Sequence, residues 1–224
     1  MNRLESLISD IEAEAHDTSR WTGRRQFSPR VIGAMRTVRR AGFMPSGAAD
    51  RAHDNAAHAI GCGQTISQPF IVALMTDLLD LKTHHVVLEV GTGSGYQAAV
   101  LAALVDHVWS IEVIPELAER ARAALAAERV DNVTVRVGDG ALGWPEQAPF
   151  DAIMVTAAAR EVPTALIEQL RSPGRMAIPI GAPQADQELR LIAKDASGAV
   201  QSRGILPVAF VPLTGAGGAI DERR

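Results

Sequence analysis

The stretch that most constrains the fold of this chain is a short apolar run that leads directly into a glycine-rich turn. Residues 86–90 are mostly apolar and long enough for a buried strand, and glycines follow at positions 91, 93 and 95. A helical pattern of apolar residues then extends to residue 104. Glycine lets a loop turn sharply and lets a ligand lie against backbone amides at a helix N-terminus. The stretch therefore predicts a strand, a tight loop and a helix that form a nucleotide-type binding site.

The spacing of the glycines narrows the class of ligand. A dinucleotide-binding motif of the form G-x-G-x-x-G needs its third glycine at position 96, where this chain has Tyr96. A phosphate-binding P-loop is excluded as well, because no Gly-Lys-Ser or Gly-Lys-Thr follows. The spacing G-x-G-x-G therefore indicates a different nucleotide ligand.

Acidic residues accompany three predicted strands. Glu89 lies in the first strand, and a second strand at 108–111 ends in Glu112. A third strand at 133–137 is followed by Asp139. A carboxylate at Glu112 suits the two hydroxyls of a ribose. Any one of these acids could cap a helix, but three in register with the glycine loop favour a cofactor site. With no lysine nearby, they favour a cationic ligand over a pyrophosphate, and S-adenosylmethionine, with its sulfonium and ammonium groups, fits.

The overall composition favours an ordinary soluble protein. The 224 residues carry a formal net charge of −4, which gives no overall attraction to nucleic acid or to an anionic membrane. The one cysteine, Cys62, allows neither a disulfide nor a cysteine metal cluster, and we expect no metal. No apolar run approaches membrane-spanning length and the N-terminus lacks a secretory apolar segment, so we expect a cytoplasmic location without membrane contact. We also expect a monomer.

Charge is nevertheless uneven along the chain. Seven arginines and no acid lie between Thr18 and Ala49. A solvated or salt-bridged helical face is the favoured explanation. The alternative is a face for an anionic or nucleic-acid partner, which would make the chain an RNA or DNA methyltransferase. Against this alternative, Val155 is followed by Thr-Ala-Ala and not by the Asn-Pro-Pro-Tyr type of motif of adenine-amino methyltransferases.

The residues before the glycine loop predict a helical lobe and a polar loop. Apolar residues at helical spacing predict a helix over 3–15, and Ser28 followed by proline predicts the N-cap of a second helix. Residues 46–67 show little periodicity and many polar side chains, so we expect a loop that holds a polar substrate. A further helix begins at Pro69. The spacing favours Ser67 as the N-cap of that helix at least as strongly as it favours a catalytic role for Ser67.

From residue 86 onward, strands and helices alternate. Further strands are predicted at 150–155, 175–180, 188–193 and 204–211, and helices at 97–104, 115–125 and 163–170. The last two strands have no helix between them, so the sheet should close with an antiparallel hairpin. We expect one structural unit with a helical N-terminal lobe and substrate loop over 1–67, a methyltransferase domain over 68–214 and a loose tail over 215–224.

Several motifs of the chain are similar to those of one enzyme family. The most distinctive is the run Gly-Cys-Gly-Gln-Thr-Ile-Ser-Gln-Pro at 61–69, and residues 88–97, 138–140 and 149–158 also match. The match extends from about the second predicted helix to residues 210–213. Together they resemble the protein-L-isoaspartate (D-aspartate) O-methyltransferases, a family of cytoplasmic repair enzymes. The resemblance implies an α/β protein with the Rossmann-like S-adenosylmethionine-dependent methyltransferase fold. In that fold a mostly parallel seven-stranded sheet ends in an antiparallel C-terminal hairpin.

The resemblance also implies an activity. S-adenosyl-L-methionine would be the cofactor and S-adenosyl-L-homocysteine the product. The methyl group would pass to the free α-carboxylate of L-isoaspartyl residues, and to the β-carboxylate of D-aspartyl residues, in damaged proteins and peptides. The ester would then cyclise to a succinimide, whose hydrolysis returns some normal aspartyl bonds. A carboxylate has a reference pKa of about 4 and needs no general base, so catalysis reduces to desolvation and positioning.

The family's functional residues can be transferred to matching positions of this chain. Ser67 falls on the position regarded as the active-site serine. The implied substrate-binding residues are Asp54, Asn55, Ile60, Gly63, Gln64 and Thr65. The implied cofactor-binding residues are Glu89, Gly91, Thr92, Gly93, Gly95, Tyr96, Glu112, Gly138, Asp139, Gly140 and Thr156. Glu112 is expected to hold the ribose, Asp139 the adenine edge, and Glu89 with the glycine loop the methionine end.

One pair of residues departs from the family pattern. His58-Ala59 stand where the family usually has Leu-Pro. The departure lies on the substrate side and motivates an alternative, a carboxylate methyltransferase dedicated to one maturing peptide. Another alternative is a cofactor-binding sensor without turnover, against which the intact run around Ser67 argues.

Overall fold

The computed structural model describes residues 2–182 and 186–215. The helices are α1 (Arg3–Thr22), α2 (Pro29–Thr37), α3 (Pro69–Leu78), α4 (Tyr96–Ala102), α5 (Pro115–Ala127) and α6 (Thr164–Gln169). The strands are β1 (His58–Gly61), β2 (Gln64–Ile66), β3 (Val86–Val90), β4 (His107–Glu112), β5 (Val133–Val137), β6 (Phe150–Val155), β7 (Leu170–Ile180), β8 (Gln187–Lys194) and β9 (Val200–Val208). Short 3-10 helices occupy Arg40–Phe43, Ala49–Arg51, Gly140–Leu142 and Pro145–Gln147.

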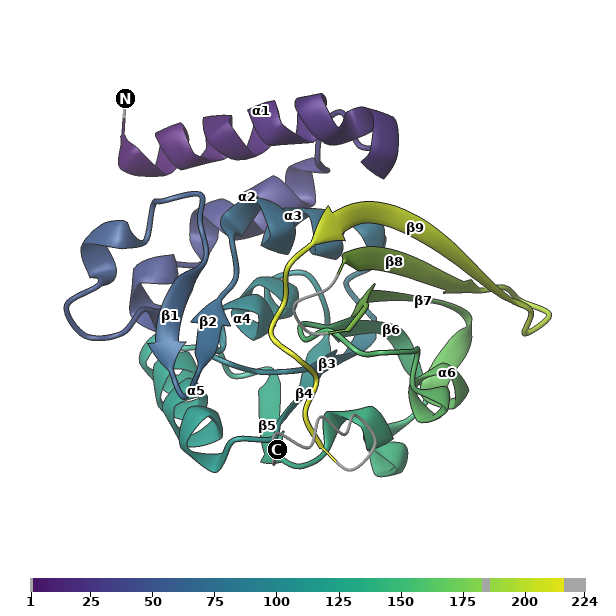
Figure 1. Cartoon of the computed structure of the whole chain (residues 1–224). Helices are drawn as coiled ribbons and strands as arrows, with labels where there is room; N and C mark the ends of the chain where they lie inside the picture. Colours follow the sequence, from purple (N-terminus) through teal and green to yellow (C-terminus); the bar gives the residue numbers. More distant parts are fainter. Residues whose placement is uncertain (1, 183–185, 216–224) are drawn as a thin grey trace.

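A central sheet organises these elements (Figure 1). In the described residues it has seven strands in the order β5-β4-β3-β6-β7-β8-β9. Neighbouring strands from β5 across to β7 are parallel, whereas β8 is antiparallel to both β7 and β9. The predicted mostly parallel sheet with an antiparallel C-terminal hairpin is confirmed.

Strand β3 lies where the order of the sheet reverses. It pairs with β4 on one side and with β6 on the other. After β3 the chain continues to β4 and β5 on the first side, whereas after β6 it continues to β7 on the opposite side. Val87 and Leu88 belong to two different hydrophobic clusters, because consecutive side chains of a strand point to opposite faces. Both faces of the sheet are therefore covered, and the reversal leaves a crevice at the carboxyl ends of the strands, where ligands bind in sheets of this type.

Most predicted elements have bounds close to those expected. The strands at 86–90, 133–137 and 150–155 begin and end at the predicted residues, and α3 begins at Pro69. The first helix is longer than expected, because it continues from residue 15 through a polar stretch to Thr22. Polar residues on the exposed side of a helix add no apolar periodicity, so the pattern alone underestimated its length.

The polar loop expected over 46–67 contains a hairpin instead. Strands β1 and β2 pair antiparallel, with His58 opposite Ile66. The register shifts between Ala59 and Gly61. Strands of four and three residues are too short for an alternating pattern to be recognised, and the shift breaks what alternation there is.

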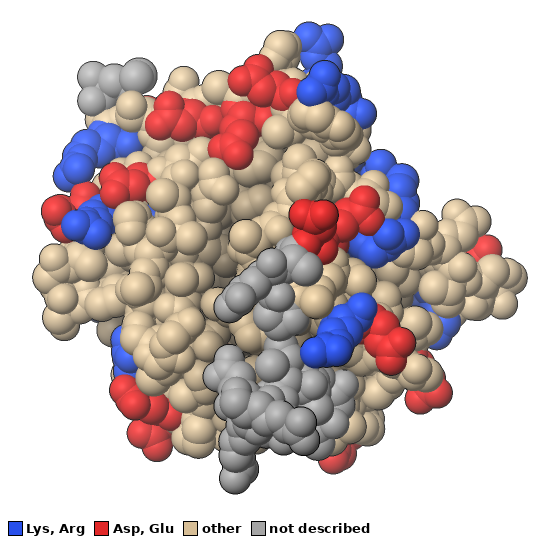
Figure 2. Space-filling view, viewed as in Figure 1, with Lys and Arg blue, Asp and Glu red and all other residues tan. Residues whose placement is uncertain are grey.

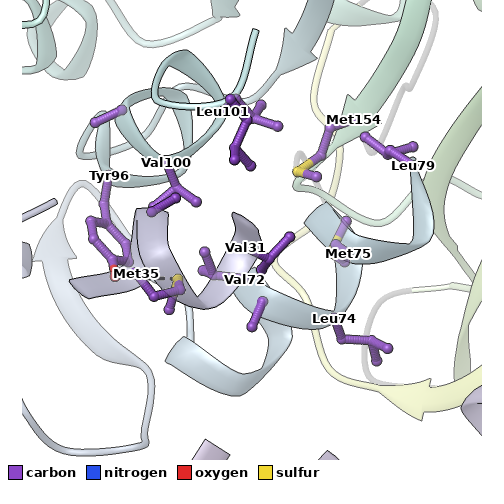
Figure 3. Close-up of a cluster of buried hydrophobic side chains, with 14 of the residues drawn as sticks. Val31, Met35, Val72, Leu74, Met75, Leu79, Tyr96, Val100, Leu101 and Met154 are labelled. Carbon is purple, nitrogen blue, oxygen red and sulfur yellow. Dashed lines mark hydrogen bonds between the residues drawn. The ribbon is translucent and has the colours of Figure 1, made fainter. Parts of the chain in front are cut away.

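The N-terminal helices share a hydrophobic core with the sheet. Figure 3 shows Val31 and Met35 of α2 and Val72 of α3 directed toward Val100 of α4, with Met154 of β6 nearby. All of these side chains are buried, and residues of α1 belong to the same cluster. The N-terminal lobe is therefore packed directly against the helix that follows the glycine loop.

Two expectations concern residues at the limits of the structure. The loose tail expected over 215–224 lies outside the described residues, apart from Gly215. The boundaries expected at residues 67 and 214 stay predictions. Among the residues described, no helix combines the length and the apolar character needed to cross a bilayer.

Shortening a side chain in the shared core should destabilise the protein. Leu101 is fully buried, so Leu101→Ala should lower the free energy of unfolding by about 2–5 kcal/mol through lost contacts and a residual cavity. Val200 is 43% exposed, and Val200→Ala should change it by less than about 0.5 kcal/mol. Urea unfolding of both variants measures the difference, and equal losses would contradict this account of the core.

Candidate active site

A cavity opens at the carboxyl ends of β3, β4 and β6. The space between its walls is about 750 Å³ and is continuous with solvent. The hairpin β1–β2 lies on one side of these strand ends, and the segment after β9 crosses the other (Figure 1). The lining residues are Gln64–Ser67, Val72, Val90–Ser94, Tyr96, Gln97, Ile111–Ile114, Gly140, Thr156, Ala157 and Val211–Thr214. Seen from the same side, the area left of centre on this face carries mainly uncharged side chains (Figure 2).

The glycine loop is tied to the end of β6. Thr156 donates its hydroxyl hydrogen toward the carbonyl oxygens of Val90 and Gly91, at 3.0 and 2.6 Å. Gly91 has a φ of +95°, and a Cβ at this position would collide with the Thr156 hydroxyl. Both the backbone conformation and the close contact require glycine here. The loop backbone therefore approaches the cavity with no side chain in the way.

Glu112 joins the glycine loop to the loop after β4. The residue is 5% exposed and lines the cavity. One carboxylate oxygen accepts a hydrogen bond from the backbone N–H of Gly93 at 2.8 Å, and the other accepts from that of Ile114 at 3.0 Å. A carboxylate oxygen has two lone pairs, so each oxygen keeps one for a ligand hydroxyl. The carboxylate is thus oriented by two backbone amides and suited to a ribose diol.

Glu89 has a different environment from the one expected. It is fully buried and is not among the residues that line the cavity. Ser110 donates to one of its carboxyl oxygens, and the hydroxyls of Ser110 and Thr92 lie 2.6 Å apart. The other carboxyl oxygen has no hydrogen-bond partner within the described chain. Glu89 therefore supports the glycine loop from beneath, through Ser110 and Thr92.

Of the three residues after β5 that are expected to bind the cofactor, Gly138, Asp139 and Gly140, one lines the cavity and two do not. Gly140 lines the cavity, and a Cβ there would collide with Val90, so its backbone packs tightly against β3. Asp139 accepts a hydrogen bond from the backbone N–H of Ala141 and caps the short helix that follows. Asp139 and Gly138 are not among the lining residues.

Two residues that the resemblance assigns to cofactor binding, Gly95 and Tyr96, lie at the start of α4 and contribute little surface to the cavity. Gly95 precedes the helix and does not line the cavity. Tyr96 contributes to the lining, but only 2% of its surface is exposed, and its ring packs toward Met35 (Figure 3). Burial raises the pKa of the Tyr96 phenol to about 12, so it stays protonated.

The opposite wall of the cavity comes from β2 and the residues after it. Gln64, Thr65 and Ser67, to which the family resemblance assigns substrate roles, all line it. Across the described residues, the Ser67 hydroxyl has no hydrogen-bond partner. The expectation that Ser67 caps α3 is wrong, because Gln68 is the N-cap and its side chain makes no capping bond. The side-chain oxygen of Asn55 instead accepts from the backbone N–H of Phe70 at 3.0 Å.

The remaining predicted substrate residues surround this wall without lining the cavity. Asn55 supports α3, and Asp54 lies 3.4 Å from the His58 ring. Ile60 belongs to β1, and its buried side chain lies close to Gly93, whereas Gly63 lies in the hairpin turn.

Site reasoning from the sequence missed one wall of the cavity. Residues 211–214 line it, and this segment runs beside the end of β6 because Ala158 exchanges backbone hydrogen bonds with Val211 and Leu213. The signal was available in part, since the resemblance extends to Leu213. No group of His, Cys, Asp and Glu side chains that could hold a metal occurs in the described parts of the chain.

The buried carboxyl group of Glu89 should make stability depend on pH. Burial raises the pKa of Glu89 from 4.5 to about 8, so between these values the folded state holds a proton that unfolding releases. Stabilisation from this group is complete below pH 4.5 and is lost as pH rises toward 8, by up to about 1.4 kcal/mol per pH unit. The glutamine of Glu89→Gln cannot ionise. The free energy of unfolding of this variant should therefore increase relative to that of the wild type as the pH rises from 4.5 to 8.

Urea unfolding at several pH values measures this difference, with Glu119→Gln as an exposed control that should show no trend. A difference for Glu89→Gln that stays constant with pH would mean that the carboxyl group is already ionised in the folded protein.

The sequence and the structure were compared with known proteins. Residues 20–218 match the family described as protein-L-isoaspartate(D-aspartate) O-methyltransferase. A protein of Nitrosococcus oceani named protein-L-isoaspartate O-methyltransferase 2 is 50% identical over 215 residues, which cover 96% of this chain and 98% of the relative. A protein of the same name from Polaromonas is 52% identical over 209 residues, covering 93% of this chain and 99% of the relative.

Solved structures show the same fold. A protein-L-isoaspartate O-methyltransferase superimposes with a TM-score of 0.82 at 26% identity, covering 96% of this chain and 67% of that chain. A Plasmodium falciparum structure, described as this type of methyltransferase in complex with S-adenosyl-L-homocysteine, gives 0.78 at 22% identity, covering 96% and 99%. With its glycine loop, its Ser67 wall and relatives that match along nearly their whole length, this chain belongs to the protein-L-isoaspartate(D-aspartate) O-methyltransferase family.

Proposed function

We propose that this protein transfers a methyl group from S-adenosyl-L-methionine to the free α-carboxylate of L-isoaspartyl residues, and to the β-carboxylate of D-aspartyl residues, in damaged proteins and peptides. The methyl ester then cyclises to a succinimide, which initiates repair. Family membership supports this activity. The observation that carries it is that the Ser67 wall and the glycine loop line one cavity, with Glu112 beside the loop.

The residues of the cavity fit the cofactor. When bound, S-adenosyl-L-methionine supplies the electrophilic methyl group. Glu112 holds the ribose hydroxyls with its two remaining lone pairs, and the glycine loop borders the methionine end. Asp139 would hold the adenine edge, and Glu89 would act through the hydroxyls of Ser110 and Thr92. The proposed cofactor-binding set is Glu89, Gly91, Thr92, Gly93, Gly95, Tyr96, Glu112, Gly138, Asp139, Gly140 and Thr156.

Ser67 and the nearby backbone position the substrate carboxylate. The carboxylate is ionised at neutral pH and is already a nucleophile, so the protein has no proton to remove. The free Ser67 hydroxyl donates a hydrogen bond to one oxygen, and backbone amides of residues 61–66 orient the group. Holding the other oxygen in line with the methyl group can contribute on the order of 7–11 kcal/mol. The wider substrate-binding set is Asp54, Asn55, Ile60, Gly63, Gln64 and Thr65.

Two peptides that differ only in an aspartyl or isoaspartyl linkage test the activity. With radiolabelled S-adenosyl-L-methionine, we expect base-labile methylation of the isoaspartyl peptide alone. Ser67→Ala should lower kcat/KM about 10- to 100-fold, as for loss of one hydrogen bond to a charged group. Ser9→Ala, on the exposed side of α1, should not change it. Several unrelated isoaspartyl peptides should be tested, because His58, which departs from the family pattern, lies beside Asp54 on the substrate side. If the protein methylates none of these peptides, the repair activity is refuted.

The proposed role of Glu112 predicts a loss of cofactor affinity. In Glu112→Gln, one carboxylate oxygen is replaced by an amide nitrogen, which donates and cannot accept hydrogen bonds. The site therefore loses the acceptor for one of the two backbone N–H groups, that of Gly93 or that of Ile114, and for one ribose hydroxyl. The Kd for S-adenosyl-L-homocysteine should rise about 10- to 100-fold by calorimetry. Glu119→Gln is the matched control, and an unchanged Kd for Glu112→Gln would remove Glu112 from the cofactor site.

The partners and the location are also proposals. We propose a cytoplasmic monomer that binds isoaspartyl proteins and no nucleic acid. The stretch from Thr18 to Ala49 with its seven arginines is called the basic segment below. Three of these arginines form ion pairs, Arg24 with Asp77, Arg36 with Glu5 and Arg39 with Glu128. This supports the interpretation of the segment as a salt-bridged face. The exposed thiol of Cys62 is free, in keeping with a reducing compartment.

A further inference from the structure

One arginine of the basic segment is buried. Arg40 is 5% exposed and lies in the short helix before the substrate loop. Its guanidinium donates to four backbone carbonyl oxygens: those of Ala52 and Asp54 at 3.2 Å, that of Ala56 at 2.8 Å and that of Ser67 at 2.9 Å. Burial lowers the pKa of Arg40, but an arginine stays protonated near neutral pH. The expectation of a solvated or salt-bridged face is therefore wrong for this residue.

The four acceptors come from two separate segments of the chain. Three belong to residues 52–56, which carry Asp54 and Asn55, and the fourth belongs to Ser67 itself. One planar guanidinium with five donors can join these segments in a fixed geometry. A lysine ammonium is a compact point charge with three donors and could not span all four carbonyls.

A second residue of the N-terminal lobe holds the other side of Ser67. Glu14 of α1 accepts from the side-chain amide of Asn55 at 2.8 Å and from that of Gln68 at 3.0 Å. Asn55 in turn accepts from the backbone N–H of Phe70. Arg40 thus holds the carbonyl of Ser67, while Glu14 and Asn55 hold the residues that follow it.

We propose that Arg40 is a positioning residue for methyl transfer, with Glu14 as its counterpart on the other side of Ser67; this inference rests on the proposed function. The Ser67 hydroxyl makes no hydrogen bond in the described chain, so its direction depends on how the backbone at residue 67 is held. Arg40 supplies that restraint and sets the distance between Ser67 and residues 52–56. A displacement of about 1 Å at such a site can cost about 100-fold in rate.

Arg40→Lys and Arg40→Gln test the proposal, with Arg36→Gln as the control because Arg36 forms an exposed ion pair with Glu5. We expect kcat/KM for the isoaspartyl peptide to fall about 10- to 100-fold in both Arg40 variants. The Kd for S-adenosyl-L-homocysteine should stay within about twofold of the wild-type value. None of the four carbonyls that Arg40 holds belongs to the proposed cofactor-binding set, and its approach to that set is to the buried Tyr96 ring, whose centroid lies 5.9 Å from the guanidinium carbon. Unchanged kcat/KM, or an equal loss of cofactor affinity, would overturn the proposal.

Two further measurements keep the test decisive. If the Arg40 variants do not fold, Glu14→Gln should still raise the KM for the peptide with cofactor affinity unchanged, and Glu12→Gln, which is exposed on the same helix, should not. Hydrogen exchange of the folded variants should be faster at residues 52–56 and near Ser67, and unchanged exchange there would refute the positioning role without reference to activity. Failure of the wild type to methylate the peptide would instead refute the proposed function.

Discussion

The site depends on the close approach of two strands at the reversal point of the sheet. Strands β3 and β6 are parallel neighbours, and Thr156 at the end of one bonds to the carbonyl of Gly91 at the end of the other. Only a glycine fits at this contact with a left-handed backbone. The loop can then turn across the strand ends toward Glu112, whose carboxylate receives the Gly93 amide. A preformed cavity for a nucleotide-like ligand follows from this one contact.

The two walls of the cavity are held by different means. The cofactor wall follows a continuous stretch of chain, from β3 through the glycine loop to α4, and backbone conformation largely determines its shape. The proposed substrate wall consists of Ser67 and strand β2 of a short hairpin. Side chains from α1 and from the helix at 40–43 support it across long sequence separations. The N-terminal lobe thus supports the proposed substrate wall and is more than an appendage.

The sequence predicted the regular parts of the fold well. Strands at 86–90 and 150–155 were found because both are mostly apolar runs with clear ends, and the strand at 133–137 was found because its valines alternate with polar residues. The hairpin at 58–66 was missed because its strands are too short to show a pattern. The cap of α3 was assigned to Ser67 on spacing, yet Asn55, far away in sequence, accepts from its N-terminal amide. The N-terminal amide of α3 is bonded by a residue 15 positions away and not by the neighbouring Ser67. A local sequence pattern does not reveal such a long-range hydrogen bond.

The sequence by itself determined the glycine loop, the seven strands, the acid at 112 and the family, because each depends on neighbouring residues or on a short motif. The tertiary structure alone decided what each candidate touches. It buried Glu89 away from the cavity, brought residues 211–214 to its rim and directed Arg40 to four carbonyls. The physical reason is that backbone carbonyls occur at every residue. An arginine that binds them therefore has no partner that the sequence can reveal, and burial depends on neighbours distant in the chain.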